Sequence, residues 1–169
     1  MAVAPASAAN YEEITRGEFV KAIIEGLGVP VGSGKSVKFK DVPDSLKPYI
    51  EKAVELKLIK GKTATEFAPD EKLTRTHASI IAARGIQDGK TYSEDVLNKF
   101  KDANKVGADV RQEVAKAVEL GLLTGFEDST IRPNNIITKE ELQEILHSFL
   151  NEHRPILYSK FKNSNLLIL

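Results

Sequence analysis

Three basic residues stand where their charge suits an anion better than it suits a helix. Each directly follows a threonine that is expected to cap a helix, in the pairs Thr15–Arg16, Thr74–Arg75 and Thr138–Lys139. The start of a helix already presents positive charge, so a cation there costs roughly 0.3 kcal/mol or more. Beside the unpaired backbone N–H groups of a first helical turn, such a cation can hold a carboxylate or a phosphate.

These cations also have a plainer interpretation. Surface cations often pair with nearby acids in solvent, and such pairs need no ligand. The recurrence of Arg16, Arg75 and Lys139 at one equivalent place favours anion binding, because unrelated surface charges have no reason to repeat there. Three such sites would suit acidic groups carried by a polymer.

The polar residues around these cations are explained by helix capping, in which side chains bond the first backbone N–H groups of a helix. The expected caps are Thr15, Glu18, Thr74, Thr138 and Glu141. His77 replaces the glutamate in the middle copy, so a one-sided cap without the reciprocal bond is expected there.

An internal repeat contains these stretches. Gly61, Pro69 and Thr74 recur 64 residues later as Gly125, Pro133 and Thr138. Eight of the twenty-four aligned positions that begin at Ala53 and Ala117 are identical without a gap, where chance gives roughly one or two. Each unit consists of a helix, a loop and a second helix. Since neither helix can bury its apolar stripe alone, adjacent units are expected to share a core.

Apolar residues at helical spacing predict an all-α fold. Helices are expected over residues 15–27, 45–59, 74–85, 109–122 and 138–150, with a linker and one helical turn over 87–98. Asp109 is expected to cap the fourth helix with Gln112. Gly121 is expected to allow close packing, and Gly125 to allow a left-handed turn.

Composition excludes several classes of function. The 24 basic and 24 acidic residues cancel, so no overall field attracts nucleic acid or a membrane surface. The absence of cysteine excludes thiol nucleophiles, cysteine metal sites and disulfides. No apolar run is long enough to span a bilayer, and no membrane insertion is expected.

No cofactor, metal site or catalytic activity is expected. A calcium loop from Asp128 would place its twelfth ligand on Lys139, which excludes the usual site. His147 and His153 do not share a helix face with which to hold a metal. Residues 31–36 lack the first glycine of a phosphate-binding loop. The carboxylates show no pairing that suggests catalysis.

The order of these motifs resembles the S-layer homology domain. Phe-x-Asp, at Phe39 and Phe100, precedes a helix with Ala-x-x-x-Gly-(Ile or Leu)-(Ile or Leu)-x-Gly near its end, then an apolar-x-Pro loop and Ile-Thr-Arg-x-Glu. The resemblance covers roughly residues 14–150. It implies a non-catalytic module, usually three units in a pseudo-threefold helical assembly, which holds exported proteins on the cell wall.

The resemblance also implies a ligand and a location. The ligand would be an anionic, typically pyruvylated, secondary cell-wall polysaccharide of a Gram-positive-type bacterium, bound outside the cell at the wall or S-layer. Grooves between units would use the Arg or Lys of the Thr-Arg motif. The candidate ligand-binding residues are Arg16, Arg75, Lys139, Gly61, Gly125, Asp41 and Asp102. The glycines would shape adjoining loops, and the aspartates would either accept sugar hydroxyls or cap a turn.

The chain departs from the family pattern in several places. The predicted division is a leader (1–13), a partial unit (14–38), a unit (39–87), a linker (88–99), a unit (100–150) and a tail (151–169). The leader is either the end of a secretory signal or an unstructured end. Either the domain was cut, or the shortened unit would be completed by the tail or by another chain.

His77 and Lys62 also depart from the family pattern, and these departures predict that the ligand-binding site of the middle unit is altered. The alternative function is protein–protein interaction within a cell-surface assembly, with another surface-layer protein or a second copy as partner. Basic residues at groove-lining helix starts would favour the polysaccharide, and a large exposed apolar patch would favour a protein.

Overall fold

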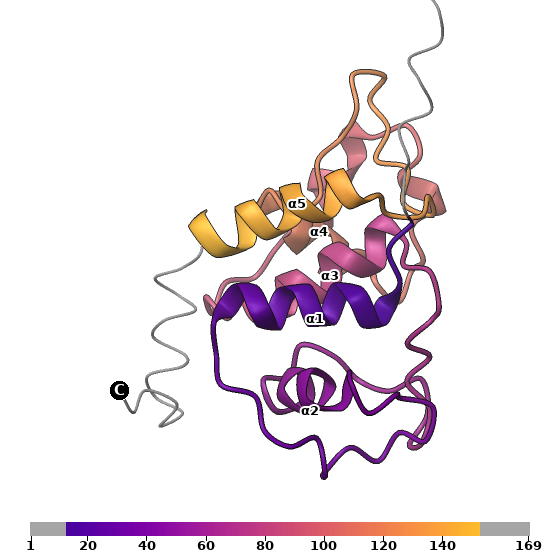
Figure 1. Ribbon diagram of the computed structural model, residues 1–169. Coiled ribbons are helices and arrows are strands. Elements are labelled where there is room, and N and C mark those ends of the chain that lie inside the picture. The colour runs from indigo at the N-terminus through magenta and orange to yellow at the C-terminus, as the bar shows by residue number, and fades with distance from the viewer. Residues whose placement is uncertain (1–12, 153–169) are drawn as a thin grey trace, which may run out of the picture.

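The computed structural model describes residues 13–152. Its elements are α1 (Arg16–Leu27), α2 (Lys47–Glu55), α3 (Arg75–Gly85), η1 (Glu94–Lys99), η2 (Ala103–Lys105), α4 (Arg111–Glu119), α5 (Lys139–His147) and η3 (Ser148–Glu152). Over this range β-structure is limited to isolated bridges, so the predicted all-α class is confirmed (Figure 1). The predictions for the leader and tail concern residues 1–12 and 153–169, which lie outside the described range.

Helices α1, α3 and α5 each begin directly after the predicted threonine. In α1, the Thr15 hydroxyl accepts the Glu18 N–H at 3.3 Å, and the Glu18 carboxylate accepts the Thr15 N–H at 2.8 Å. Helix α5 starts with the same reciprocal pair. In α3, Thr74 accepts the N–H of His77 at 3.2 Å, and only this half of the capping box is formed. The local capping pattern therefore fixes where these three helices start.

The α4 helix begins later than the sequence predicts. Its N-cap is Val110, which makes no side-chain cap bond, so the prediction that Asp109 caps this helix is wrong. The physical reason is a preceding turn, in which the N–H of Val110 donates to the carbonyl of Gly107 at 3.1 Å. Helix α2 also starts after a turn and has Pro48 in its first turn, where proline costs no helical hydrogen bond.

Both α2 and α4 end early because the backbone turns left-handed shortly after them. Lys57 follows α2 with φ 59°, and Gly121 follows α4 with φ 70°. Gly121 thus provides the left-handed turn that the sequence predicted for Gly125. Gly125 instead permits a close approach, since a side chain there would collide with the ring of Phe100. The two predicted glycine roles are therefore exchanged.

The segments before α1, α3 and α5 meet in a closed ring of backbone hydrogen bonds. Leu73 N–H donates to the Ile14 carbonyl at 3.1 Å, Ile137 N–H to Leu73 at 2.8 Å, and Ile14 N–H to Ile137 at 3.3 Å. All three side chains are buried. Three helices therefore start at one junction, although the pseudo-threefold arrangement of whole units stays a prediction.

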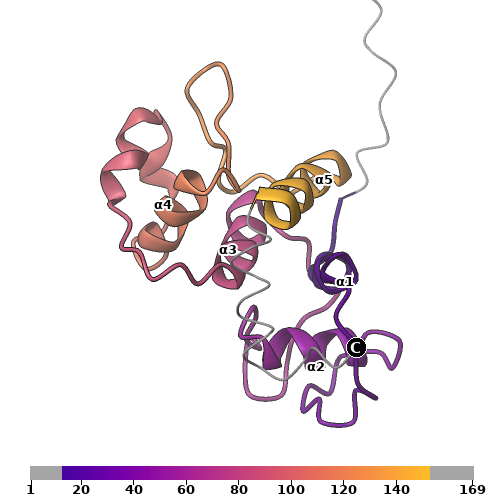
Figure 2. The ribbon, with the colours of Figure 1, turned by 90° about the vertical axis from the view of Figure 1, so that its left-hand side faces the viewer.

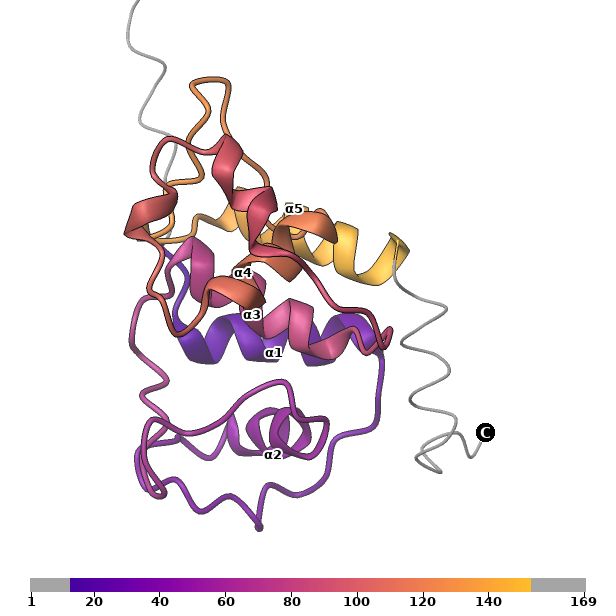
Figure 3. The same cartoon turned by 180° about the vertical axis from the view of Figure 1, so that it is seen from behind.

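The remaining helices pack outside these three. Helix α2 lies on α1 and α4 lies on α3, while α5 contacts both α1 and α3 (Figure 2). Seen from behind, η1 lies beside α4 (Figure 3). No helix among residues 13–152 combines the length and apolar character needed to cross a bilayer.

The core joins segments that are distant in sequence. Its largest fully buried side chains include Phe19 of α1, Phe67 of the loop after α2 and Phe149 of η3. Burying each phenylalanine contributes about 2–3 kcal/mol. Phe149 lies so close to Gly85 that a Cβ there would be 2.8 Å from its ring. The last helical turn of the described chain is thus packed onto α3.

Candidate ligand-binding site

The backbone N–H groups at the starts of α1 and α3 are already bonded. Arg16 N–H donates to the Glu71 carbonyl at 2.8 Å, and Gly17 N–H donates to Pro69 at 2.8 Å. In α3, Arg75 N–H donates to the Asn135 carbonyl at 2.9 Å, and its neighbour is likewise bonded to the following loop. The idea that these helix starts offer unpaired N–H groups to an anion is therefore wrong. Only the side chains remain available.

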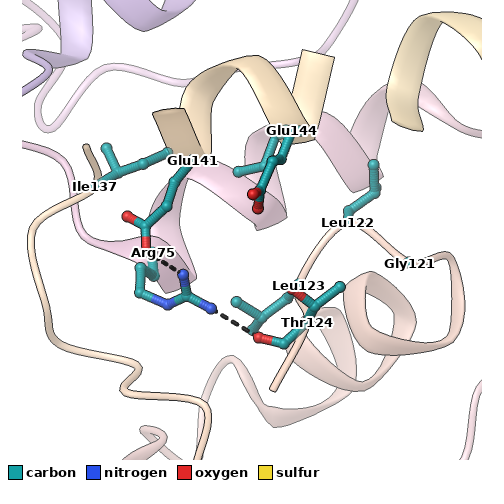
Figure 4. Close-up of a pocket in the computed structure, with 9 residues that line it drawn as sticks. Arg75, Gly121, Leu122, Leu123, Thr124, Ile137, Glu141 and Glu144 are labelled. Carbon is teal, nitrogen blue, oxygen red and sulfur yellow. Dashed lines mark hydrogen bonds and ion pairs between the residues drawn. The ribbon is translucent and has the colours of Figure 1, made fainter. Parts of the chain in front are cut away.

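The side chain of Arg75 is bonded on all sides (Figure 4). Its Nε donates to the Ile131 carbonyl at 3.0 Å and its Nη2 to the Thr124 carbonyl at 2.7 Å, while Nη1 is paired with the Glu141 carboxylate. The guanidinium also lies over the Phe126 ring. Arg75 is only 6% exposed, and the cavity beside it measures about 30 Å³. That is roughly the volume of one water molecule.

Arg16 occupies the equivalent place one unit earlier and is far less satisfied. Its Nη2 donates to the Lys60 carbonyl at 2.7 Å, and its guanidinium lies over the Phe67 ring at 4.6 Å. Its Nε is buried and has no hydrogen-bond partner. Burial lowers the pKa of Arg16, although a guanidinium remains protonated in proteins. The adjoining cavity has a volume of about 240 Å³.

Substitutions at matching positions of the repeat give these two cavities different charges. The charged residues that line the Arg16 cavity are Arg16, Lys62, Lys72, Arg84 and Glu71. Those that line the Arg75 cavity are Arg75, Glu141 and Glu144. The Arg16 cavity has four cations and one carboxylate, which give a formal charge of +3. The Arg75 cavity has one cation and two carboxylates, which give a formal charge of −1.

Three cations of the Arg16 cavity have carboxylate partners of their own. These ion pairs are Lys62–Glu71, Lys72–Glu13 and Arg84–Glu113. Arg16 itself forms no ion pair with any residue between 13 and 152. The cavity therefore combines one unpaired, partly buried guanidinium with a rim of paired, more exposed cations, an arrangement suited to a single negative group.

His77 lies in the wall of this cavity, at the position that Glu141 holds in the other unit. Burial lowers the pKa of His77, and the positive charge of Arg16 lowers it further. At neutral pH the imidazole is therefore uncharged, and in neither protonation state does it carry a negative charge that could neutralise Arg16. The departure at His77 thus affects the cavity of Arg16, not that of Arg75, and it leaves the cavity open.

Asp41 and Asp102 have equivalent structural roles. Asp41 accepts the backbone N–H groups of Phe67 and Ala68, at 2.9 and 2.7 Å. Asp102 accepts those of Ile131 and Arg132 at 2.9 and 2.8 Å. Each carboxylate thus holds the apolar-x-Pro loop, which is the turn role weighed from the sequence. Their contact with sugar hydroxyls stays a prediction.

Gly61 and Gly125 lie under the rings of Phe39 and Phe100, where a side chain would collide with the ring. They shape the adjoining loops, but neither lines the Arg16 or the Arg75 cavity. Lys139 is exposed at the start of α5, and the role predicted for it in anion binding stays a prediction.

Sequence reasoning missed the cationic rim of the Arg16 cavity. Lys62, Lys72 and Arg84 gave no motif, since they lie in a loop, before α3 and near its end. A signal existed for Arg84, because it follows His77 by seven residues and such residues share a helix face. The positions of Lys62 and Lys72 beside Arg16 could be recognised only in the folded structure.

The phosphate-binding loop and the metal site that were weighed from the sequence are filled or lack a donor set. The glycine-containing segment before α2 wraps around Glu51, whose carboxylate accepts the N–H groups of Gly34 and Ser36 at 2.9 and 3.0 Å. A phosphate would have to displace this internal anion. The described residues contain no cluster of three His, Cys, Asp or Glu that could hold a metal ion.

Comparison with known proteins supports the resemblance. The sequence model of the S-layer homology domain matches residues 38–78 and 99–142. A surface-layer 125 kDa protein of Lysinibacillus sphaericus is 33% identical over 110 residues, covering 62% of this chain and 9% of that protein. An endoglucanase of Bacillus sp. (strain KSM-635) is 31% identical over 98 residues, covering 56% of this chain and 10% of the enzyme. Cell surface glycoprotein 1 of Acetivibrio thermocellus is 26% identical over 155 residues, covering 85% and 7%.

The all-α fold and the repeated sequence pattern place the chain in the class of helical repeat proteins. More specifically, the chain belongs to the S-layer homology domain family, whose model matches half of it. This membership and the surface-layer relatives indicate association with the cell surface or cell wall. The chain spans only about a tenth of the length of these relatives, so the similarity does not extend to the catalytic activity of the endoglucanase.

Proposed function

We propose that this chain anchors an exported protein to a bacterial cell wall by binding an anionic, pyruvylated wall polysaccharide in the Arg16 cavity. The observation that carries the proposal is the Arg16 guanidinium, whose buried Nε has no partner. Leaving a buried donor unsatisfied costs about 1–3 kcal/mol. The same guanidinium forms no ion pair with any described residue, so its charge is left for a ligand in the cavity.

The chemistry of the cavity selects a carboxylate. A carboxylate pairs with the Arg16 guanidinium that lines the cavity, and charge-assisted bonds of this kind are roughly twice as strong as neutral ones. Lys62 and Arg84 at the rim add positive potential. Each already has a carboxylate partner, so neither has to bond the ligand directly. The apolar side chains of Ile80 and Ile81 in the same wall suit the methyl group of a pyruvate ketal or the face of a sugar ring.

The size of the cavity restricts the ligand to a small part of the polymer. Its volume of about 240 Å³ is less than the roughly 300–1,000 Å³ of typical small-molecule sites. One acidic sugar residue therefore enters, and the rest of the chain lies outside. A terminal or single pyruvylated residue is the ligand we expect.

The alternative, a protein-binding module, has less support on the described surface. A contiguous exposed apolar patch of several hundred Å² would mark a protein-binding surface. The large hydrophobic residues that are well exposed between residues 13 and 152 are Val31 and Val54. These two valines do not form a patch of that size.

The test is a calorimetric titration with purified secondary cell-wall polysaccharide, in its native form and after mild acid removal of the pyruvate ketals. Three proteins are compared: wild type, Arg16→Gln, and Lys105→Gln. Arg16→Gln removes the cation of the cavity and keeps a polar side chain. Lys105 lies in η2, outside the cavity, so Lys105→Gln is the matched control for loss of one positive charge.

Binding is expected for the wild type and for Lys105→Gln. It should weaken about tenfold or more for Arg16→Gln, as for loss of a hydrogen bond to a charged group, and disappear after ketal removal. Equal binding by Arg16→Gln and wild type would overturn the assignment of the site. Absence of binding by the folded wild type would overturn the proposed ligand.

A further inference from the structure

A pocket beside α2 lies outside the proposed ligand site. Its volume is about 510 Å³, and apolar side chains line much of it, namely Val37, Phe39, Val54 and Ala64. Val54 is 43% exposed and is one of the two large hydrophobic residues that are well exposed between residues 13 and 152. Part of the apolar surface of this unit is thus left uncovered by the described residues.

The repeat shows what this pocket lacks. In the following unit, η1 packs on α4, and its fully buried Leu97 stands three residues before Phe100. The residue three before Phe39, the equivalent phenylalanine, is Ser36, and Ser36 lines the pocket. Residues 31–38 form no helix that could take the place of η1. The α2 unit therefore lacks a leucine that fills the equivalent place in the α4 unit.

The helices beneath these segments differ in the same sense. Val118 of α4 matches Val54 in the repeat and is half-buried, whereas Val54 is exposed. The polar side of the pocket is already satisfied, because the Glu51 carboxylate accepts the N–H groups of Gly34 and Ser36 at 2.9 and 3.0 Å. What remains uncovered is apolar, so the pocket suits an apolar segment better than a polar ligand.

The chain carries such a segment outside the described range. Residues 166–169 read Leu-Leu-Ile-Leu, four consecutive apolar residues. Residues 1–12, which also lie outside that range, contain neither leucine nor isoleucine. Of these two parts of the chain, only the later one can supply a leucine in place of Leu97.

The charges of the pocket and of this later part are opposite in sign. The pocket is lined by two carboxylates and one lysine, with a formal charge of −1: Glu51, Glu55 and Lys38. Residues 153–169 carry three cations and no Asp or Glu: Arg154, Lys160 and Lys162. Complementary charges favour the encounter and its orientation, while the apolar contacts hold the segment in place.

The described chain ends close enough for the segment to reach the pocket. The Phe149 ring and Leu58 Cδ2 lie 2.8 and 3.0 Å from one point, the Cβ that a side chain at Gly85 would have. Leu58 follows α2 by three residues, and Glu55, the last residue of α2, lines the pocket. The thirteen residues 153–165 can span up to about 45 Å, whereas α2 is only about 14 Å long.

We propose that residues 166–169 dock in the pocket beside Val54 and place a leucine where the other unit has Leu97. The chain then covers the exposed apolar side of α2 with a later segment of its own. Attachment to the same chain raises the effective concentration of the segment to the millimolar range. The contact is independent of the polysaccharide, because the pocket shares no lining residue with the Arg16 cavity.

The experiment is NMR of ¹³C-labelled valine, leucine and isoleucine methyl groups in the full chain. Four proteins are compared: wild type, Val54→Ser, Val31→Ser, and a variant with serine at all four positions 166–169. Val31 is 39% exposed and does not line the pocket, so Val31→Ser is the matched control for loss of an exposed valine. Circular dichroism establishes that each variant is folded.

In the wild type, nuclear Overhauser effects should connect the Val54 methyl groups with those of residues 166–169. The variant with four serines should lose these effects and shift the Val54 signals. Val54→Ser should shift the signals of residues 166–169, because the ratio of docked to undocked segment falls about tenfold, the scale of roughly two buried methyl groups. Val31→Ser should leave the signals of residues 166–169 as they are in the wild type.

Three results would overturn this proposal. Absence of Overhauser effects between Val54 and residues 166–169 in the wild type would show that the segment does not dock there. Equal shifts of these residues in Val54→Ser and Val31→Ser would remove the assignment to the pocket. In a sample that mixes labelled and unlabelled chains, effects that pass only between two chains would assign the pocket to a second copy and refute docking within one chain.

Discussion

Replacing each arginine by methionine separates a structural arginine from one held ready for a ligand. Arg75→Met removes hydrogen bonds to Thr124 and Ile131 and the ion pair to Glu141. The side chain of Arg75 is 8% exposed and that of Glu141 is 20% exposed. Breaking one partner of such a buried pair costs about 3–5 kcal/mol, and we expect a loss of stability in that range.

Arg16→Met should cost much less. It removes one bond, to the Lys60 carbonyl, together with a buried Nε that has no partner. A typical hydrogen bond contributes about 1 kcal/mol net, and loss of the unsatisfied donor offsets part of it. The flexible methionine chain can keep the contact with the Phe67 ring. We expect a loss of about 1 kcal/mol or less.

Urea unfolding followed by far-UV circular dichroism measures the difference. With a slope of about 2 kcal/mol per molar urea, a gap of about 3 kcal/mol between the variants moves the midpoint by about 1.5 M. Equal midpoints for Arg75→Met and Arg16→Met would refute the reasoning, because both arginines would then be structural. A lower midpoint for Arg16→Met would reverse the assignment of the two sites.

Three further predictions follow from the same contacts. Asp102→Asn should lower stability by about 2 kcal/mol in urea unfolding, because one of two buried backbone N–H groups then faces an amide that cannot accept it. Asp41→Asn should cost less because Asp41 is exposed. Partial desolvation of its carboxylate raises the pKa of Asp41, but the backbone N–H bonds outweigh this effect and the net pKa is lowered. The wild-type advantage should therefore exist above the unfolded pKa and vanish as pH falls through the folded pKa. Gly61→Ala should lower the free energy of unfolding by about 2–3 kcal/mol, because the added Cβ collides with Phe39. Gly89→Ala is the control, since Gly89 has φ 70° and no heavy atom within 4 Å of the added Cβ. It should cost only the roughly 1–2 kcal/mol of left-handed backbone strain. Carboxylate binding at Arg16 should strengthen as pH falls through the lowered pKa of His77, because the bound anion favours the protonated ring, and this gain should be absent from calorimetry of His77→Gln.

The charges around His77 set the size of that pH effect. Arg16, Lys62 and Arg84 oppose its protonation, and Glu71 favours it. A bound carboxylate would join Glu71 and shift the balance toward the charged ring. Binding below neutral pH should therefore take up a proton, which calorimetry in two buffers of different ionisation enthalpy detects. Identical heats in the two buffers at acidic pH would contradict this coupling.

The starts of α1, α3 and α5 could be predicted because they depend on residues three positions apart. Thr15 and Glu18 carry enough information to define a capping box without any tertiary contact. The start of α4 could not be predicted in this way. Asp109 satisfies the same pattern, but the backbone closes a turn on Gly107 first, and nothing in the local sequence ranks one choice above the other.

The state of each arginine could not be predicted because it depends on distant partners. Arg75 is neutralised by Glu141, which is 66 residues away, and the helix starts are bonded by loops of the following unit. The argument from helix polarity singled out Arg16, whose role as a ligand-binding cation stays a prediction. It treated Arg75 as the same kind of site because both follow a capping threonine.

The contacts that hold the two units in shape explain how their cavities can differ. Asp41 and Asp102 bond backbone N–H groups, and the arginines reach backbone carbonyls. The helix starts are held by carbonyls of the next loop. Because these contacts use main-chain partners, an exchange such as His77 for Glu141 leaves them intact. The charge of a cavity can therefore change from one unit to the next while the fold remains the same, so carboxylate binding has to be assigned site by site.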